Sequence, residues 1–251
     1  MKAIIQHSQG TFAVDLSKPL DISIPLRASK NNVNAWYIDE PEIKPVKLKK
    51  YVGSVKQGGA VNFNDIYFNP HAHGTHTECV GHITEELHSI NQNLKTFFFL
   101  AELISVAPEN YMADTHISKE QLEFALKEKS PEAVVIRTMP NLKAKMNKQY
   151  SHTNWTYIDE DAMTFLVSKG VKHVLIDLPS VDREQDGGQL QSHKNFWNFD
   201  GELRMDCTIT ELIYVPNKIK DGAYLLNLQI APFENDASPS KPVLYKILAN
   251  G

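Results

Sequence analysis

The most informative part of the sequence is HAHGTHTECVGH, which occupies positions 71–82. Four of the 10 histidines of the chain lie in it, together with Glu78. Imidazole and carboxylate groups suit zinc, manganese and iron, and a short turn can present several of them at once. His76 and Glu78 are two positions apart, so in an extended chain their side chains lie on one face and can bind the same ion. The spacing therefore favours a metal-binding turn over a surface loop of solvated histidines.

Composition and charge argue against several classes of protein. At 251 residues, of which 42% are hydrophobic and 22% charged, the chain can bury a full core. A net charge of -4 without a basic stripe argues against nucleic-acid binding. Two cysteines cannot make a disulfide framework, and no apolar stretch approaches the ~20 residues of a membrane-spanning helix. We expect one domain over residues 1–251, located in the cytoplasm, with neither nucleic acid nor membrane among its partners.

Hydrophobic patterning predicts many strands in the chain. Residues 20–26 (LDISIPL) alternate as a half-buried strand does. Residues 97–106 (FFFLAELISV) are apolar and β-prone enough for a buried strand, although their length also allows a helix. Residues 208–215 and 224–231 predict two more strands, joined as a hairpin across 216–222.

The middle of the chain alternates helix and strand. Ser118 and Gln121 have the spacing of a capping box, which predicts a helix start. Asp159 is a candidate cap for a second helix. Residues 134–136 and 171–177 are apolar runs that predict buried strands on either side of that helix. A strand, helix and strand in this order form a crossover unit, so we expect an α/β fold with parallel pairing.

On these residues the chain resembles the cyclase-like metal-dependent hydrolases, the family of bacterial kynurenine formamidase and isatin hydrolase. The family signature is His-x-Gly-Thr-His-x-Asp-x-Pro-x-His, and Gly74-Thr75-His76-x-Glu78-x3-His82 falls onto it. Residues 21–26 (DISIPL), 134–138 (VVIRT) and 170–182 (GVKHVLIDLPSVD) are similar to further family segments in the same order. The resemblance implies a swivelling β/β/α fold, in which mixed sheets or a barrel-like β core carry flanking helices.

The resemblance also implies a function and a set of site residues. The implied reaction is hydrolysis of an amide or cyclic amide in a small-molecule substrate, with one or two zinc or manganese ions as cofactor. The implied residues are His71, His76 and Glu78 for a first ion, Glu78, His193 and Glu211 for a second ion, and His82 as general acid/base. Relatives of this type imply a homodimer or a higher homo-oligomer.

The sequence departs from the signature at its first histidine. That position is Ala72, and His71 and His73 lie on either side of it. In a strand, an offset of one residue turns a side chain to the opposite face unless a bulge before Gly74 corrects it. We choose His71 as the ligand because His73 is tied directly to the Gly74 turn; the alternative is that the first site lacks a ligand. Ala72, and Glu78 in place of Asp, also favour an alternative, a non-catalytic metal- or ligand-binding member of the fold. A further alternative is a lactone or ester hydrolase, because metal-hydroxide chemistry does not depend on a nitrogen leaving group.

Three further polar residues follow the predicted strand at 171–177. Asp177, Ser180 and Asp182 lie at its carboxyl end, where polar site residues often gather. The same residues suit loop capping equally well. The sequence leaves both interpretations open.

Overall fold

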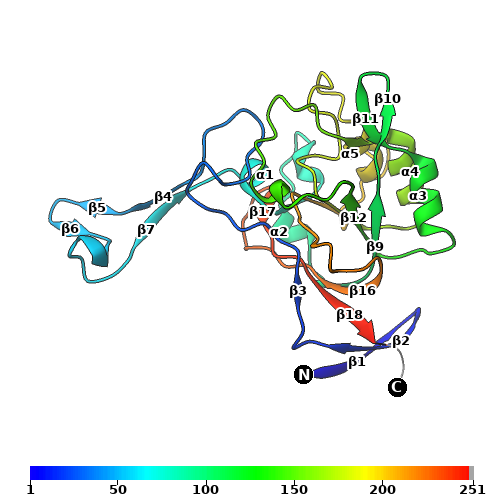
Figure 1. Ribbon diagram of the computed structural model, residues 1–251, viewed down its shortest axis with the longest axis horizontal. Helices are drawn as coiled ribbons and strands as arrows, with labels where there is room; N and C mark the ends of the chain where they lie inside the picture. The colour runs from blue at the N-terminus through cyan, green and yellow to red at the C-terminus, as the bar shows by residue number, and fades with distance from the viewer. Residues whose placement is uncertain (249–251) are drawn as a thin grey trace.

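The structure is a computed structural model, which describes residues 1–248. Its main body is built on an 11-stranded mixed sheet, and an arm projects from one side of it (Figure 1). In spatial order the strands are β1 (Lys2–His7), β2 (Gly10–Asp15), β18 (Val243–Leu248), β16 (Gly222–Asn227), β9 (Phe98–Val106), β12 (Ala133–Thr138), β14 (His173–Ile176), β15 (Thr208–Glu211), β8 (His76–Glu78) and β17 (Ala237–Pro239), with β3 (Leu20–Asp21) paired to β18. The α/β class predicted from the sequence is confirmed.

Smaller elements surround this sheet. The helices are α1 (Pro70–His73), α2 (Ile90–Asn93), α3 (Lys119–Leu126), α4 (Glu160–Ser168) and α5 (Gln191–Trp197), with short 3-10 turns η1 (Val55–Gln57), η2 (Val80–His82) and η3 (Lys143–Asn147). The remaining strands are β4 (Glu42–Pro45), β5 (Lys47–Leu48), β6 (Tyr51–Val52), β7 (Asn64–Tyr67), β10 (Glu109–Tyr111), β11 (Asp114–Ile117) and β13 (Tyr157–Ile158). Within residues 1–248, none of the helices combines the length and the apolar character needed to cross a bilayer.

The four central strands β9, β12, β14 and β15 are parallel, as the predicted crossover requires. Helices α3, α4 and α5 lie in the connections between them and cover one face (Figure 1). Alternate residues of β12 enter two separate cores: Val134 and Ile136 pack under the helices, while Ala133 and Val135 pack on the opposite face. Because both faces of the sheet are buried here, the sequences of these strands are continuous apolar runs.

The helix starts are close to prediction. Ser118 forms the expected capping box of α3, since its hydroxyl accepts from the Gln121 amide and the Gln121 side chain accepts from the Ser118 amide. Helix α4 begins after Asp159, but this carboxylate makes no capping hydrogen bond. It pairs with His116 Nδ1 at 2.6 Å instead. A nearby imidazole has therefore replaced the helix amides as its partner.

The strand predictions at 20–26 and 97–106 differ in accuracy. The second is confirmed, because β9 occupies nearly all of that run. The first is only partly right: β3 is confined to Leu20–Asp21, and Ser23 adds an isolated bridge to Ile213. Beyond this strand, the Ile24 amide donates to Thr75 Oγ1 at 2.7 Å, next to β8.

The predicted hairpin between residues 208–215 and 224–231 is wrong. β15 pairs with β14 and β8, whereas β16 pairs with β9 and β18, so three strands separate them. The segment that runs from β15 to β16 is held by the buried Arg137, which donates to Ile219 O at 2.8 Å and to Asp221 Oδ1 at 2.6 Å. Apolar alternation indicates that a segment is extended, but it does not identify the strand that it joins.

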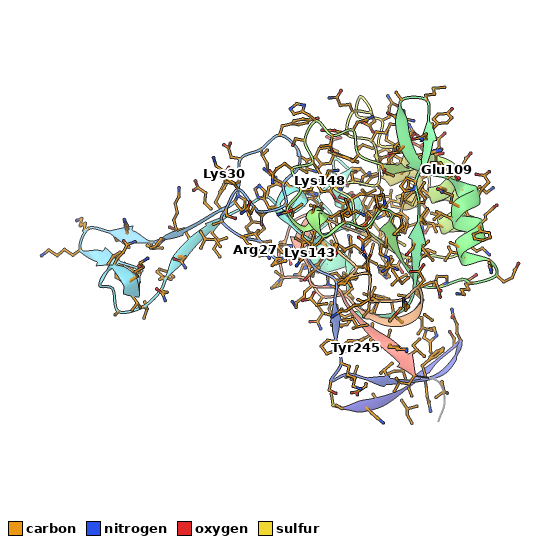
Figure 2. The ribbon with its side chains drawn as sticks, viewed as in Figure 1. Arg27, Lys30, Glu109, Lys143, Lys148 and Tyr245 are labelled. Atoms are coloured by element: carbon orange, nitrogen blue, oxygen red, sulfur yellow. The ribbon has the colours of Figure 1, made fainter. Side chains whose placement is uncertain are left out.

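The arm consists of β4 and β7, which pair antiparallel, and of β5 and β6 beyond them (Figure 1). Its side chains extend into solvent along both edges (Figure 2). Several are large and apolar, and their exposed fractions reach 58% at Ile66 and 73% at Tyr67. A two-stranded ribbon is marginally stable alone, and exposed apolar surface of this kind is typical of an interaction site.

Burial of His173 on β14 gives a prediction for stability against pH. Its Nδ1 faces Thr208 Oγ1 at 2.9 Å, and burial lowers the pKa of His173 from 6.5 to about 3. Between these pH values the unfolded chain takes up a proton that the folded chain does not, so the free energy of unfolding falls as pH falls below 6.5. We expect a His173→Gln variant to lose about 2 kcal/mol less than the unsubstituted chain between pH 6.5 and 4.5, measured by urea unfolding. Equal losses in the two proteins would contradict this assignment.

Candidate active site

Two of the predicted residues lie on strand β8, which is the second strand from one edge of the main sheet. It lies between β15 and β17, with His76 opposite Glu211 and Glu78 opposite Ala237 in the register. His76 and Glu78 are two residues apart in a strand, so they face the same side, and both are completely buried. His76 Nδ1 donates to Gly74 O at 3.0 Å, which leaves Nε2 directed into the cluster.

His71 enters the cluster from the helical turn α1. Asn69 caps this turn by accepting from the His71 amide at 2.9 Å, and Pro70 occupies the first helical position. His71 Nδ1 lies 3.1 Å from Glu78 Oε2. The one-residue offset from the signature is thus absorbed by a turn of helix, and the proposed bulge before Gly74 is wrong.

His73 and Gly74 have structural roles. His73 Nδ1 accepts from the Asn69 amide at 2.9 Å, and Nε2 donates to Asp39 O at 2.8 Å, so both ring nitrogens are engaged away from Glu78. Gly74 has φ 166°, which is extended backbone open to any residue. The expectation that Gly74 forms a tight turn is therefore wrong, and of the two candidate histidines only His71 contacts Glu78.

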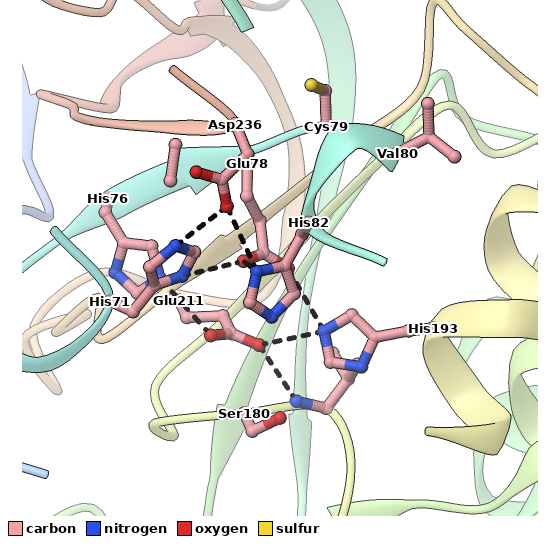
Figure 3. Close-up of polar contacts among 12 residues, drawn as sticks. His71, His76, Glu78, Cys79, Val80, His82, Ser180, His193, Glu211 and Asp236 are labelled. Atoms are coloured by element: carbon pink, nitrogen blue, oxygen red, sulfur yellow. Dashed lines mark hydrogen bonds and ion pairs between the residues drawn. The ribbon is translucent and has the colours of Figure 1, made fainter. Parts of the chain in front are cut away.

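His193 and Glu211 reach the same cluster from α5 and β15 (Figure 3). His193 Nε2 lies 3.1 Å from Glu78 Oε1 and 3.9 Å from Glu211 Oε1. Glu211 Oε2 lies 3.3 Å from His76 Nε2, and its Oε1 accepts from the Val181 amide at 3.0 Å. Residues that are far apart in the sequence thus meet around two buried carboxylates.

Asp182 lies directly behind His193. Its Oδ2 accepts from His193 Nδ1 at 2.5 Å, and its Oδ1 accepts from the Ser192 amide at 2.9 Å. This contact fixes the ring so that Nε2 faces Glu78, the arrangement by which a carboxylate commonly orients a metal-binding histidine. Asp177 instead pairs with Lys145 at 2.8 Å, and Ser180 caps the loop through the Asp182 amide. Of these three residues, only Asp182 contacts the cluster.

His82, on the turn η2, lies at the outer side of the cluster. Its Nδ1 is 3.9 Å from Glu78 Oε2 and 3.1 Å from Asp236 Oδ2. Its side chain is 29% exposed, more than that of His71, His76 or His193. His82 is therefore the histidine of the cluster with the most access to solvent.

Asp236 is a member of the cluster that sequence reasoning missed. Its Oδ2 lies 3.0 Å from His71 Nε2 and 3.1 Å from His82 Nδ1 (Figure 3). It comes from the residue before β17, which pairs with β8. No motif marks it in the sequence, because its position follows from a strand pairing between distant segments.

The charges in the cluster are mutually stabilising. Burial alone raises the pKa of Glu78, but electrostatic attraction to His82 and the close contacts with His193 and His71 outweigh burial and hold this pKa well below its usual range. Burial lowers the pKa of His71, and contacts with Asp236 and Glu78 reverse this and raise it to about 10. The imidazoles therefore supply positive charge to the carboxylates, which is the charge that a bound cation supplies.

The donor set fits a metal ion. Three overlapping groups have ligand atoms within 4.8 Å of one another. They are His71, His76 and Glu78; Glu78, His82 and His193; and His71, His82 and Asp236. His76 Nε2 and Glu78 Oε2 are buried polar atoms whose contacts, with Glu211 Oε2 at 3.3 Å and His71 Nδ1 at 3.1 Å, lack the alignment of a hydrogen bond, and both point into the first group. Buried polar atoms rarely lack partners, so these two are suited to coordinate an ion.

Comparison with protein families and curated proteins gives a consistent result. A family model described as "Putative cyclase" matches residues 14–183. A kynurenine formamidase from Bacillus cereus is 26% identical over 233 residues, which cover 92% of this chain and 99% of that protein. A kynurenine formamidase from Bacillus cytotoxicus is 25% identical over 230 residues, covering 91% of this chain and 97% of that protein.

Solved structures share the fold. A predicted metal-dependent hydrolase from Bacillus stearothermophilus superposes with a TM-score of 0.63 at 19% identity, over 91% of this chain and 98% of that one. An isatin hydrolase bound to the product analogue thioisatinate gives a TM-score of 0.65 at 17% identity, over 92% of this chain and 93% of that one. The fold therefore extends over nearly the whole length of both proteins.

Proposed function

The chain belongs to the putative cyclase family, and from this premise we propose that it is a metal-dependent hydrolase of an amide or cyclic amide. The observation that carries the proposal is the position of Glu78, a buried carboxylate in contact with His71, His82 and His193. The names of the relatives, kynurenine formamidase and isatin hydrolase, support amide hydrolysis as the reaction class.

The cluster supports a division of the residues between binding and proton transfer. His71, His76 and Glu78 are proposed to hold a first ion, and Glu78, His193 and Glu211 a second where one is bound. A bound zinc or manganese ion supplies a Lewis acid that polarises the amide carbonyl. Glu78 is proposed as the shared ligand because its two oxygens face different histidines, with Oε2 toward His71 and Oε1 toward His193.

His82 is proposed as the general acid/base. Its partial exposure lets a substrate approach the ring. Its Nδ1 is engaged by Asp236, and among the described residues its Nε2 makes no hydrogen bond, so this nitrogen can donate a proton to the leaving amide nitrogen. Imidazole suits this role because its unperturbed pKa is near 6.5.

Elemental analysis combined with an activity panel tests the proposal. We expect purified protein to hold at least one equivalent of zinc or manganese, and to hydrolyse aryl formamides or cyclic amides at a rate that a chelator abolishes and added metal restores. Matched ester and lactone substrates test the alternative reaction, in which the leaving group is an oxygen instead of a nitrogen. Tight metal binding without turnover would assign a binding function instead, and protein that binds no metal would refute both.

We propose further that the chain forms a homodimer or a larger homo-oligomer through the arm. The exposed apolar residues of β4 and β7 support this, because a second copy of the chain would cover them. An Ile66→Lys variant is expected to lower the molar mass found by light scattering, to that of a single chain if the assembly is a dimer. Phe124→Lys is the matched control, since Phe124 is 79% exposed on α3, outside the arm. Unchanged mass in Ile66→Lys, or an equal fall in both variants, would exclude the arm as the interface.

A further inference from the structure

Asp236 is a carboxylate that contacts two histidines of the cluster through a single oxygen. Its Oδ2 accepts from His71 Nε2 at 3.0 Å and from His82 Nδ1 at 3.1 Å. The two rings are correspondingly close, with centroids 4.4 Å apart and an angle of 30° between their planes. Asp236 lies outside the signature and outside residues 14–183, which the family model matches.

The backbone holds Asp236 firmly in this position. Its carbonyl accepts from the Cys79 amide at 3.0 Å, and the next residue, Ala237, pairs with Glu78 in the β17–β8 register. The preceding residue is tied as well, because Asn235 O accepts from the Ile90 amide at 2.8 Å. The carboxylate is thus mounted on the same strand pair that carries Glu78.

In both His71 and His82, one ring nitrogen contacts Asp236 Oδ2 and the other ring nitrogen points away from it. For His71 the second nitrogen, Nδ1, lies 3.1 Å from Glu78 Oε2. For His82 the second nitrogen is Nε2, which is available to a substrate. A hydrogen bond at one imidazole nitrogen decides which nitrogen carries the proton and how the ring is oriented. One carboxylate therefore governs the orientation of both rings.

We infer that Asp236 is a positioning residue, which holds His71 as a metal ligand and His82 as the proton-transfer group. The inference rests on the proposed function for the role of His82. Asp236 also explains how the chain tolerates Ala72 in the signature. His71 is displaced by one position onto the turn α1, and the contact with Asp236 directs its Nδ1 toward Glu78.

The test compares Asp236→Asn, Asp236→Glu and a matched control, Glu234→Gln. Glu234 lies in the same segment, and its carboxylate accepts from Asn91 and Gln92 on α2 rather than from the cluster. Three quantities are measured on zinc-loaded protein: zinc content, kcat and KM on the best amide substrate, and the ¹⁵N chemical shifts of the histidine rings, which report the tautomer. Circular dichroism checks that each variant is folded.

At saturating zinc we expect Asp236→Asn to keep its zinc content and its KM within about 2-fold, to lower kcat by about 10–100-fold, and to change the tautomer signals of His71 and His82. Because His71 is no longer oriented, the zinc affinity of this variant is expected to fall by at most about 10–100-fold. Asp236→Glu keeps the charge and is expected to recover part of kcat, while Glu234→Gln resembles the unsubstituted chain. Loss of one zinc equivalent in Asp236→Asn even at saturating zinc would make Asp236 a ligand and overturn the inference, as would unchanged kcat and ring shifts. If no amide is hydrolysed, the proposed function fails, and the ring shifts still decide whether Asp236 orients the two histidines.

Discussion

A Glu78→Gln variant is expected to bind zinc or manganese at least about 10²–10³-fold more weakly than the unsubstituted chain, and to lose hydrolysis in proportion. The reason is the central position of Glu78. A neutral amide removes the negative charge that His71, His82 and His193 share, and leaves these imidazoles without their common partner. Metal affinity measured by competition with a chromophoric chelator gives the change directly.

Glu102→Gln is the matched control for this substitution. Glu102 is also a buried carboxylate, but it lies on β9 and pairs with Lys129 at 2.5 Å. Its replacement is expected to affect stability and to leave metal affinity unchanged. If Glu78→Gln retained full metal content and rate, Glu78 could not be the shared ligand.

A His82→Ala variant is expected to lower kcat by about 10²–10⁴-fold while the metal content stays the same. His82 is assigned to proton transfer and not to the ions, so its loss removes the general acid alone. Its partly exposed position also leaves room for a small molecule once the ring is removed. Added imidazole is therefore expected to restore part of the rate in His82→Ala.

The control for His82 is His7→Ala, which removes a histidine of the N-terminal hairpin that pairs with Glu132. This variant is expected to keep its rate and to show no response to imidazole. Two outcomes would contradict the role of His82: an unchanged rate in His82→Ala, or a fall in rate that follows a loss of metal.

The parallel strands at the centre of the sheet could be predicted from the sequence because their signals are local. Continuous apolar runs at residues 134–136 and 171–177 and the capping box at Ser118 each report on their own neighbourhood. The hairpin across residues 216–222 was wrong because the choice of strand partner depends on distant contacts, in this case those of Arg137. A single sequence therefore gives the least information about which strands pair with each other in the sheet.

The candidate site shows the same limit. His76 and Glu78 could be placed together because the two-residue repeat of a strand is a local property. The turn that carries His71 also had a local signal, since Asn69 followed by Pro70 is typical of a helix start and argued against a bulge. Asp236 had no signal of this kind, because its contact with His71 spans 165 positions of sequence.

The pairing of β8 with β15 and β17 has a consequence for the order in which the molecule is made. During synthesis β8 emerges long before its two partner strands, so Glu78 has neither Glu211 nor Asp236 beside it for most of translation. Contacts of such long sequence separation form slowly, because the intervening chain must first be closed into a loop. The cluster around Glu78 is therefore complete only after β15 and β17 have been added, and we expect metal to bind the folded chain rather than to guide its folding.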